Sequence, residues 1–124
     1  MAQLQNTVPP PHTLPTRSFR FNIHGLWPNY KDGTWPQFCD KDYAFSESEI
    51  ADLEGALDQE WPSFGGGNEG FWAHEWDKHG TCALSVVRSE HSFFKTVLRL
   101  HWKYDLEVGV GGGFGVFRVL GCFF

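Results

Sequence analysis

A short stretch of the chain, residues 71–82, concentrates side chains that can move protons and hold an anion. They are two imidazoles, a carboxylate and an ammonium: His74, Glu75, Lys78 and His79. If the stretch is helical, with about 100° between successive residues, the four side chains form one contiguous polar arc. A solvated charged face has the same pattern, but two histidines beside tryptophan favour a functional site.

Trp72 and Trp76 fall behind this arc, where their indoles can anchor the helix to the core. Gly80 follows directly, and its position predicts a left-handed cap that ends the helix. The polar side chains would then lie on the last turns of that helix.

Another histidine follows a different pattern earlier in the chain. Apolar and polar residues alternate over 19–24, which predicts a strand with its apolar face inward. His24 stands at the end of the polar face, and Gly25 permits a sharp change of direction. A lone histidine at a strand end is more often structural, but Trp27 and Tyr30 follow it in a predicted turn. Their rings suit the stacking of a nucleobase and the filling of a core equally well.

Residues 28–42 are predicted to form a loop, since they combine proline and glycine with several Asp and Asn residues. We expect Trp35 and Phe38 to pack this loop onto the core.

Two amphipathic helices are predicted to form the scaffold. Residues 47–59 follow a capping box in which Ser46 is the N-cap and Glu49 reaches back to it. Residues 90–104 carry one apolar stripe, formed by Phe93, Val97, Leu100 and Tyr104.

Composition bounds the class of protein. The 124 residues suffice for one domain, and the 12 Phe, 6 Trp and 3 Tyr indicate an aromatic core. A formal charge of −5 argues against a broad basic surface for nucleic acid, but not against an enzyme with a local cationic pocket. No apolar run is long enough to cross a membrane, and the N-terminal residues show no signal-peptide pattern.

The segments 23–28 and 74–82 together resemble the two active-site segments of the ribonuclease T2 family. Residues 103–106 resemble the plant branch of this family, which includes the S-like and self-incompatibility ribonucleases. The resemblance implies an α+β fold, an antiparallel sheet packed with helices, here incomplete. It covers about residues 19–107, which we expect to be a partial domain between a flexible proline-rich arm, 1–18, and an atypical glycine-rich tail, 108–124. The chain is therefore expected to be truncated at both ends, with a tail that arises from mis-splicing or a shifted frame.

The chemistry of this family fits the residues. Cleaving RNA without a metal requires one group to take a proton from the ribose 2′-OH and another to protonate the departing 5′-oxygen, and histidine suits both. By resemblance His24 is the general acid and His79 the general base. His74, Glu75 and Lys78 would bind the phosphate and stabilise its developing charge. The resemblance implies an RNA substrate, no cofactor or metal, no membrane partner and a monomeric protein.

The family also implies a disulfide between Cys39 and Cys82, which leaves Cys122 without an evident partner. Such a bond indicates an oxidising compartment, and the resemblance implies secretion or a vacuolar location.

Two alternatives belong to other classes. One is a catalytically impaired remnant that binds or recognises RNA without turning it over. The other is a zinc hydrolase, suggested by the pair His74-Glu75, but the zincin pattern requires a histidine where Lys78 stands.

Overall fold

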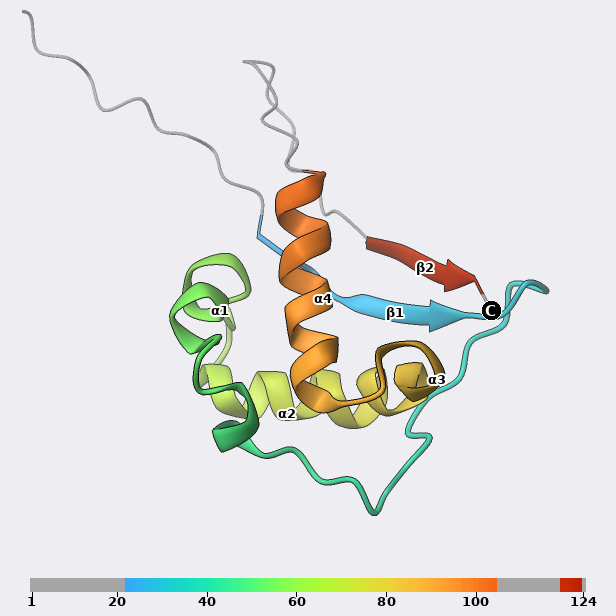
Figure 1. The fold of residues 1–124 in the computed structure, drawn as a ribbon, viewed down its shortest axis with the longest axis horizontal. Coiled ribbons are helices and arrows are strands. Elements are labelled where there is room, and N and C mark those ends of the chain that lie inside the picture. Colours follow the sequence, from blue (N-terminus) through green and yellow to red (C-terminus); the bar gives the residue numbers. More distant parts are fainter. Residues whose placement is uncertain (1–21, 105–118, 124) are drawn as a thin grey trace, which may run out of the picture.

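The computed structural model describes residues 22–104 and 119–123 of the chain. In these ranges it contains a pair of short strands and a set of helices (Figure 1). In chain order the elements are β1 (Leu26–Asn29), the 3₁₀ helix η1 (Glu47–Ile50), α1 (Glu54–Glu60), α2 (Asn68–Lys78), the 3₁₀ helix η2 (Gly80–Ala83), α3 (Leu84–Val87), α4 (Glu90–Lys103) and β2 (Val119–Phe123). The α+β class is as predicted.

The strand pair corrects the predicted sheet. β1 and β2 run parallel, with Leu26 opposite Val119, and the described residues contain no antiparallel pair. The helices of the described residues all lie between the two strands in the chain, so the second strand returns in the direction of the first. The register shifts after Trp27, where Pro28 has no N–H to donate to the ladder.

The strand also begins later than the alternating pattern predicted. His24 lies two residues before β1, and residues 27–29, predicted as turn and loop, belong to the strand. The backbone N–H of Ile23 donates to the carbonyl of Glu60 at 2.7 Å, so the end of α1 holds the segment that carries His24.

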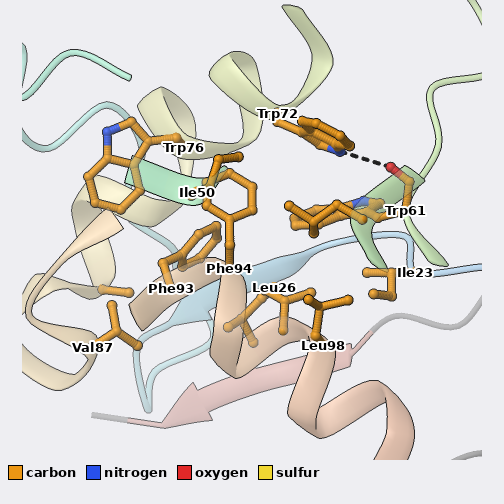
Figure 2. Close-up of a cluster of buried hydrophobic side chains, with 13 residues drawn as sticks. Ile23, Leu26, Ile50, Trp61, Trp72, Trp76, Val87, Phe93, Phe94 and Leu98 are labelled. Atoms are coloured by element: carbon orange, nitrogen blue, oxygen red, sulfur yellow. Dashed lines mark hydrogen bonds between the residues drawn. The ribbon is translucent and has the colours of Figure 1, made fainter. Parts of the chain in front are cut away.

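The largest side chains of the core are aromatic (Figure 2). Trp72 and Trp76 are buried as predicted, and the Trp72 indole donates to the carbonyl of Trp61 at 2.9 Å. The other buried apolar residues are Ile23, Leu26, Ile50, Leu57, Trp61, Ala83, Val87, Phe93, Phe94, Val97 and Leu98. They come from β1 and from every helix, so one core holds strand and helices together.

Gly80 does not end α2 as a left-handed cap. The helix ends at Lys78, and the chain continues directly into η2 with Gly80 as its first residue. A Cβ atom on Gly80 would overlap the indole of Trp76, so the position requires glycine for close packing.

The predicted helix 47–59 is divided into η1 and α1, and the predicted capping box does not form. Ser46 makes no side-chain cap, and its backbone N–H donates to both carboxylate oxygens of Glu90, at 3.2 and 3.0 Å. Glu90, at the start of α4, thus takes the position expected for Glu49.

The second predicted helix is confirmed as α4, with Ser89 as an N-cap whose hydroxyl accepts from the N–H of Ser92. Tyr104, however, is exposed and does not join the core stripe. Trp35 and Phe38 are also exposed, contrary to the prediction that they pack the loop onto the core.

Several predictions lie outside the described residues, namely the arm 1–18, the start of the strand pattern at 19–21 and most of the tail. The sequence assigned no element to the tail, yet residues 119–123 form β2. The side chain of Cys122 is also outside the described part. In the described residues no helix is both long and apolar enough to span a membrane.

We predict that Glu90 makes stability depend on pH. Its side chain is fully buried, and burial raises its pKa to about 7, against the opposing effect of the Ser46 N–H and with further help from the charges of Glu49 and Asp77. A raised carboxyl pKa favours the folded state below the unfolded pKa of 4.5, and this contribution is lost as the pH rises through about 7.

Between pH 5 and 8 the wild-type chain should therefore lose up to about 3 kcal/mol of unfolding free energy relative to Glu90→Gln, which cannot ionise. Denaturant unfolding of both proteins at the two pH values measures this difference. Parallel pH dependence in the two would show that Glu90 does not titrate in this range.

Candidate active site

Trp27 lies on the face of β1 that points away from the core. Leu26 and Pro28 are buried, whereas Trp27 between them is half-buried, as the alternation of a strand requires. Its indole N–H donates to Oε2 of Glu75 in α2 at 3.1 Å. One hydrogen bond thus joins the strand to the central helix.

Both predicted acid–base histidines contact this indole. The ring of His24 meets it edge-on, with centroids 4.9 Å apart, and the ring of His79 stacks on it at 5.0 Å and 21°. The two histidines are far apart in the sequence. Because both rings contact the same indole, the distance between their centroids cannot exceed the sum of these two distances. The structure therefore brings His24 and His79 together at Trp27.

The four polar residues of α2 and its C-cap differ in burial. Glu75 and His79, one helical turn apart, are both buried and lie against Trp27. His74 and Lys78, also one turn apart, are exposed and half-buried respectively. The predicted polar arc therefore has a buried edge against the strand and an accessible edge that carries a cation.

Burial sets the protonation of this group. It raises the pKa of Glu75, while the Trp27 N–H and the Lys78 ammonium act in the opposite direction. Burial, the Lys78 charge and the His74 charge, in decreasing order of effect, together lower the pKa of His79 to about 4. His79 is therefore neutral above about pH 4, the state in which an imidazole accepts a proton.

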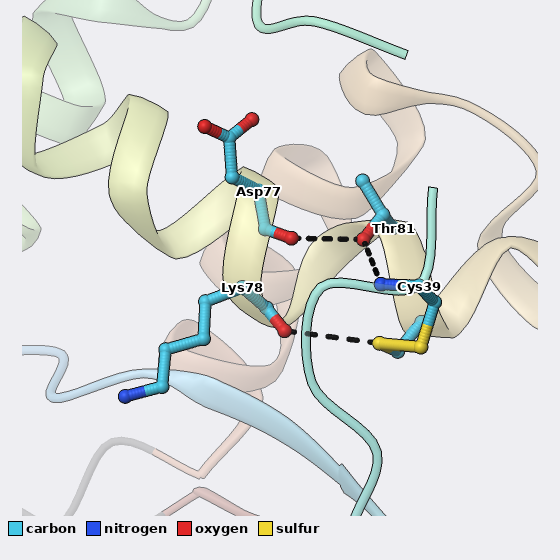
Figure 3. Close-up of a disulfide and its surroundings, with 5 residues drawn as sticks. Cys39, Asp77, Lys78 and Thr81 are labelled. Carbon is cyan, nitrogen blue, oxygen red and sulfur yellow. Dashed lines mark hydrogen bonds between the residues drawn. A yellow bond between two sulfur atoms is a disulfide. The ribbon is translucent and has the colours of Figure 1, made fainter. Parts of the chain in front are cut away.

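The disulfide Cys39–Cys82, predicted from the family resemblance, is present and ties the loop after β1 to η2, which follows α2 (Figure 3). The N–H of Cys39 donates to Oγ1 of Thr81 at 3.2 Å, and that hydroxyl donates to the carbonyl of Asp77 at 2.9 Å. The bond closes a sequence separation of 43 residues, which stabilises the fold by about 4 kcal/mol on chain-entropy grounds.

Phe38 is a neighbour of the site that the sequence did not indicate. Its ring meets the imidazole of His74 edge-on, with centroids 6.3 Å apart, and its N–H donates to the carbonyl of Lys78 at 3.0 Å. Its φ of 52° is in the left-handed region, which costs a non-glycine residue of order 1–3 kcal/mol. The available signal was its position directly before Cys39, which the resemblance pairs with a cysteine near His79.

Tyr30 follows β1 directly, and 46% of its surface is exposed. Its N–H donates to the carbonyl of Thr34, which closes a turn just beyond the strand. In the described residues no three His, Cys, Asp or Glu side chains gather closely enough to hold one metal ion.

Comparison with known proteins identifies the family. The chain matches the model of the Ribonuclease T2 family over residues 3–109. Extracellular ribonuclease LE of Solanum lycopersicum is 47% identical over 89 residues, which cover 69% of this chain and 39% of the relative. Ribonuclease 1 of Arabidopsis thaliana is 49% identical over 89 residues, covering 69% and 38%. The solved structure of RNase NT in complex with 5′-AMP aligns with a TM-score of 0.62 at 44% identity, over 68% of this chain and 42% of that one.

The chain belongs to the ribonuclease T2 family, as its two histidine-bearing segments predicted. Its fold is an incomplete version of the family's α+β fold. It spans about two-fifths of the length of these curated relatives.

We predict that replacing Lys78 by glutamine raises the pKa of His79 above its value of about 4, because the ammonium disfavours the imidazolium. The value should stay below the ordinary 6.5, since burial remains the larger cause. NMR titration of the imidazole Cε1 proton measures both proteins, and Lys95→Gln, an exposed lysine on α4, is the control. A pKa of His79 that is equal or lower in Lys78→Gln would contradict this electrostatic account.

Proposed function

We propose that this chain carries the active site of an endoribonuclease that cleaves single-stranded RNA by metal-independent transesterification through a 2′,3′-cyclic phosphate. The observation that supports it best is the contact of two imidazoles with one indole, beside an accessible histidine and a lysine. The domain formed by residues 19–107 would hold the whole constellation.

In this proposal His79 is the general base. Its imidazole takes the proton of the ribose 2′-OH, and the 2′-oxygen attacks phosphorus as the bond to the 5′-oxygen breaks. His24, as the general acid, donates its proton to that leaving oxygen, so the product ends in a 2′,3′-cyclic phosphate. The lowered pKa of His79 supports its role, because the ring is already neutral in mildly acid solution.

The phosphate would lie at the accessible edge of α2. Lys78 and His74 can supply donors and positive charge to the oxygens as negative charge develops on them. Glu75 is buried next to Lys78 and His79 and would orient the cation or the base. No step requires a metal or a cofactor.

Trp27 would hold the two histidines in position, because its indole contacts both rings and Glu75. Tyr30, exposed just beyond the strand, would offer a stacking surface for a base. Of the relatives, RNase NT is described in complex with 5′-AMP, which supports an RNA substrate.

We further propose that the protein is a monomer. We also propose that it works in an oxidising compartment, because it contains the disulfide Cys39–Cys82. One relative is named an extracellular ribonuclease and another an intracellular ribonuclease, so the family is found both outside and inside cells.

We predict that His24→Ala and His79→Ala each lower the rate of RNA cleavage about 10²- to 10⁴-fold, the contribution of one proton transfer. His91→Ala removes an imidazole of α4 that pairs with Asp52. It is the matched control and should retain activity. Cleavage of a single-stranded oligonucleotide near pH 5, with and without a chelator, measures the rate, and mass spectrometry identifies the cyclic ends.

Three outcomes would contradict the proposal. Equal rates in wild type and His79→Ala would mean that the activity comes from a contaminant. Retardation of RNA without turnover would favour a recognition protein, and loss of activity in the chelator would favour a metal hydrolase.

A further inference from the structure

The fold holds Phe38 in a backbone conformation that a phenylalanine rarely adopts. Its φ of 52° is in the left-handed region, where side chains with a Cβ are disfavoured. Contacts of two successive residues keep it there. Its N–H donates to the carbonyl of Lys78, and the next residue, Cys39, is bonded to Cys82 and donates to Thr81. The conformation is therefore imposed by contacts with the end of α2 and with η2, and is not a property of a free loop.

The side chain gains little from this position. The ring of Phe38 is 48% exposed, and the packed core does not include it. A large apolar side chain that is both strained and half exposed adds little to the stability of the fold. Its described ring contact is with His74, the accessible histidine at the phosphate edge of α2.

We propose that Phe38 is a substrate-binding residue whose ring stacks on a nucleobase of the RNA held at His74 and Lys78. The inference rests on the proposed function and adds to it a base-binding residue. A base is joined to the phosphate that it accompanies through a single sugar, so an exposed ring beside His74 is within reach of it. Aromatic side chains bind unpaired bases by stacking, largely irrespective of sequence.

Two other aromatic residues of the same loop, Tyr30 and Trp35, are also exposed. Phe38 is distinguished from them by its contact with His74 and by its strained, doubly anchored backbone. A strained residue at the edge of a site is more readily explained by a role in binding than by one in folding.

The test compares the 124-residue wild-type chain with three variants. Phe38→Leu keeps an apolar side chain without a π face, Phe38→Tyr restores a ring, and Phe38→Asn suits the left-handed backbone. The substrates are a diribonucleotide and two analogues in which one or the other base is replaced by hydrogen. Trp102→Leu, which removes an exposed ring from α4, is the matched control.

Phe38→Leu should raise the KM for the diribonucleotide about 5- to 150-fold, the usual effect of losing one base–aromatic stack, with little change in kcat. The effect should disappear with the analogue that lacks the stacked base, and Phe38→Tyr should restore the wild-type KM. Phe38→Asn should lose affinity in the same way while its melting temperature rises by several degrees, because the backbone strain is relieved.

If Phe38→Leu has the wild-type KM, the inference about Phe38 fails and the proposed function stands. The same holds if the KM of Phe38→Leu is raised for both analogues as well. If the wild-type chain cleaves nothing, the proposed function fails, and fluorescence anisotropy with a 2′-deoxy oligonucleotide then decides about Phe38. Weaker binding of the oligonucleotide by Phe38→Leu than by wild type would support a stacking role. Equal binding by the two proteins would exclude that role, and so would a wild-type chain that does not bind at all.

Discussion

The hydrogen bond from the indole of Trp27 to the carboxylate of Glu75 is the contact on which the arrangement of the site depends. It crosses from β1 to α2 and fixes the plane of a ring that both His24 and His79 touch. Because Glu75 is buried and Trp27 stacks on His79, the pair excludes solvent from His79 as well. The same burial that anchors the helix therefore lowers the pKa of His79 and raises that of Glu75. Packing and acid–base properties have a single physical origin here.

Close approach to the tryptophan rings makes this geometry possible. A Cβ atom on Gly25 would overlap the indole of Trp27 and crowd the Glu75 carboxylate, and one on Gly80 would overlap Trp76. Neither glycine has a positive φ, so both are required for space and not for an unusual backbone. Together they let the segment that carries His24 and the turn that follows His79 lie directly against the rings that position them.

The sequence predicted a feature correctly where a local pattern of residues, or the family resemblance, was enough to determine it. The i, i+4 spacing of Trp72 and Trp76 predicted their burial, the stripe in residues 90–104 predicted α4, and the family resemblance predicted the disulfide. It failed where distant contacts overrode local signals. Ser46 donates to Glu90, 44 residues away, and not to Glu49. The prediction for Gly80 failed for another reason, since the nearby indole of Trp76 requires a residue without a Cβ atom there. The left-handed backbone of Phe38 depends on contacts with α2 and η2, which no local pattern contains.

The most direct test of this account is the kinetics of RNA cleavage by Trp27→Phe, which keeps a ring beside the histidines but removes the donor to Glu75. If the indole positions the two imidazoles, kcat should fall about tenfold to a hundredfold while KM changes little, because the buried carboxyl group of Glu75 loses this donor. An unchanged kcat with a raised KM would contradict the account, because Trp27 would then act on the substrate and not on His24 and His79.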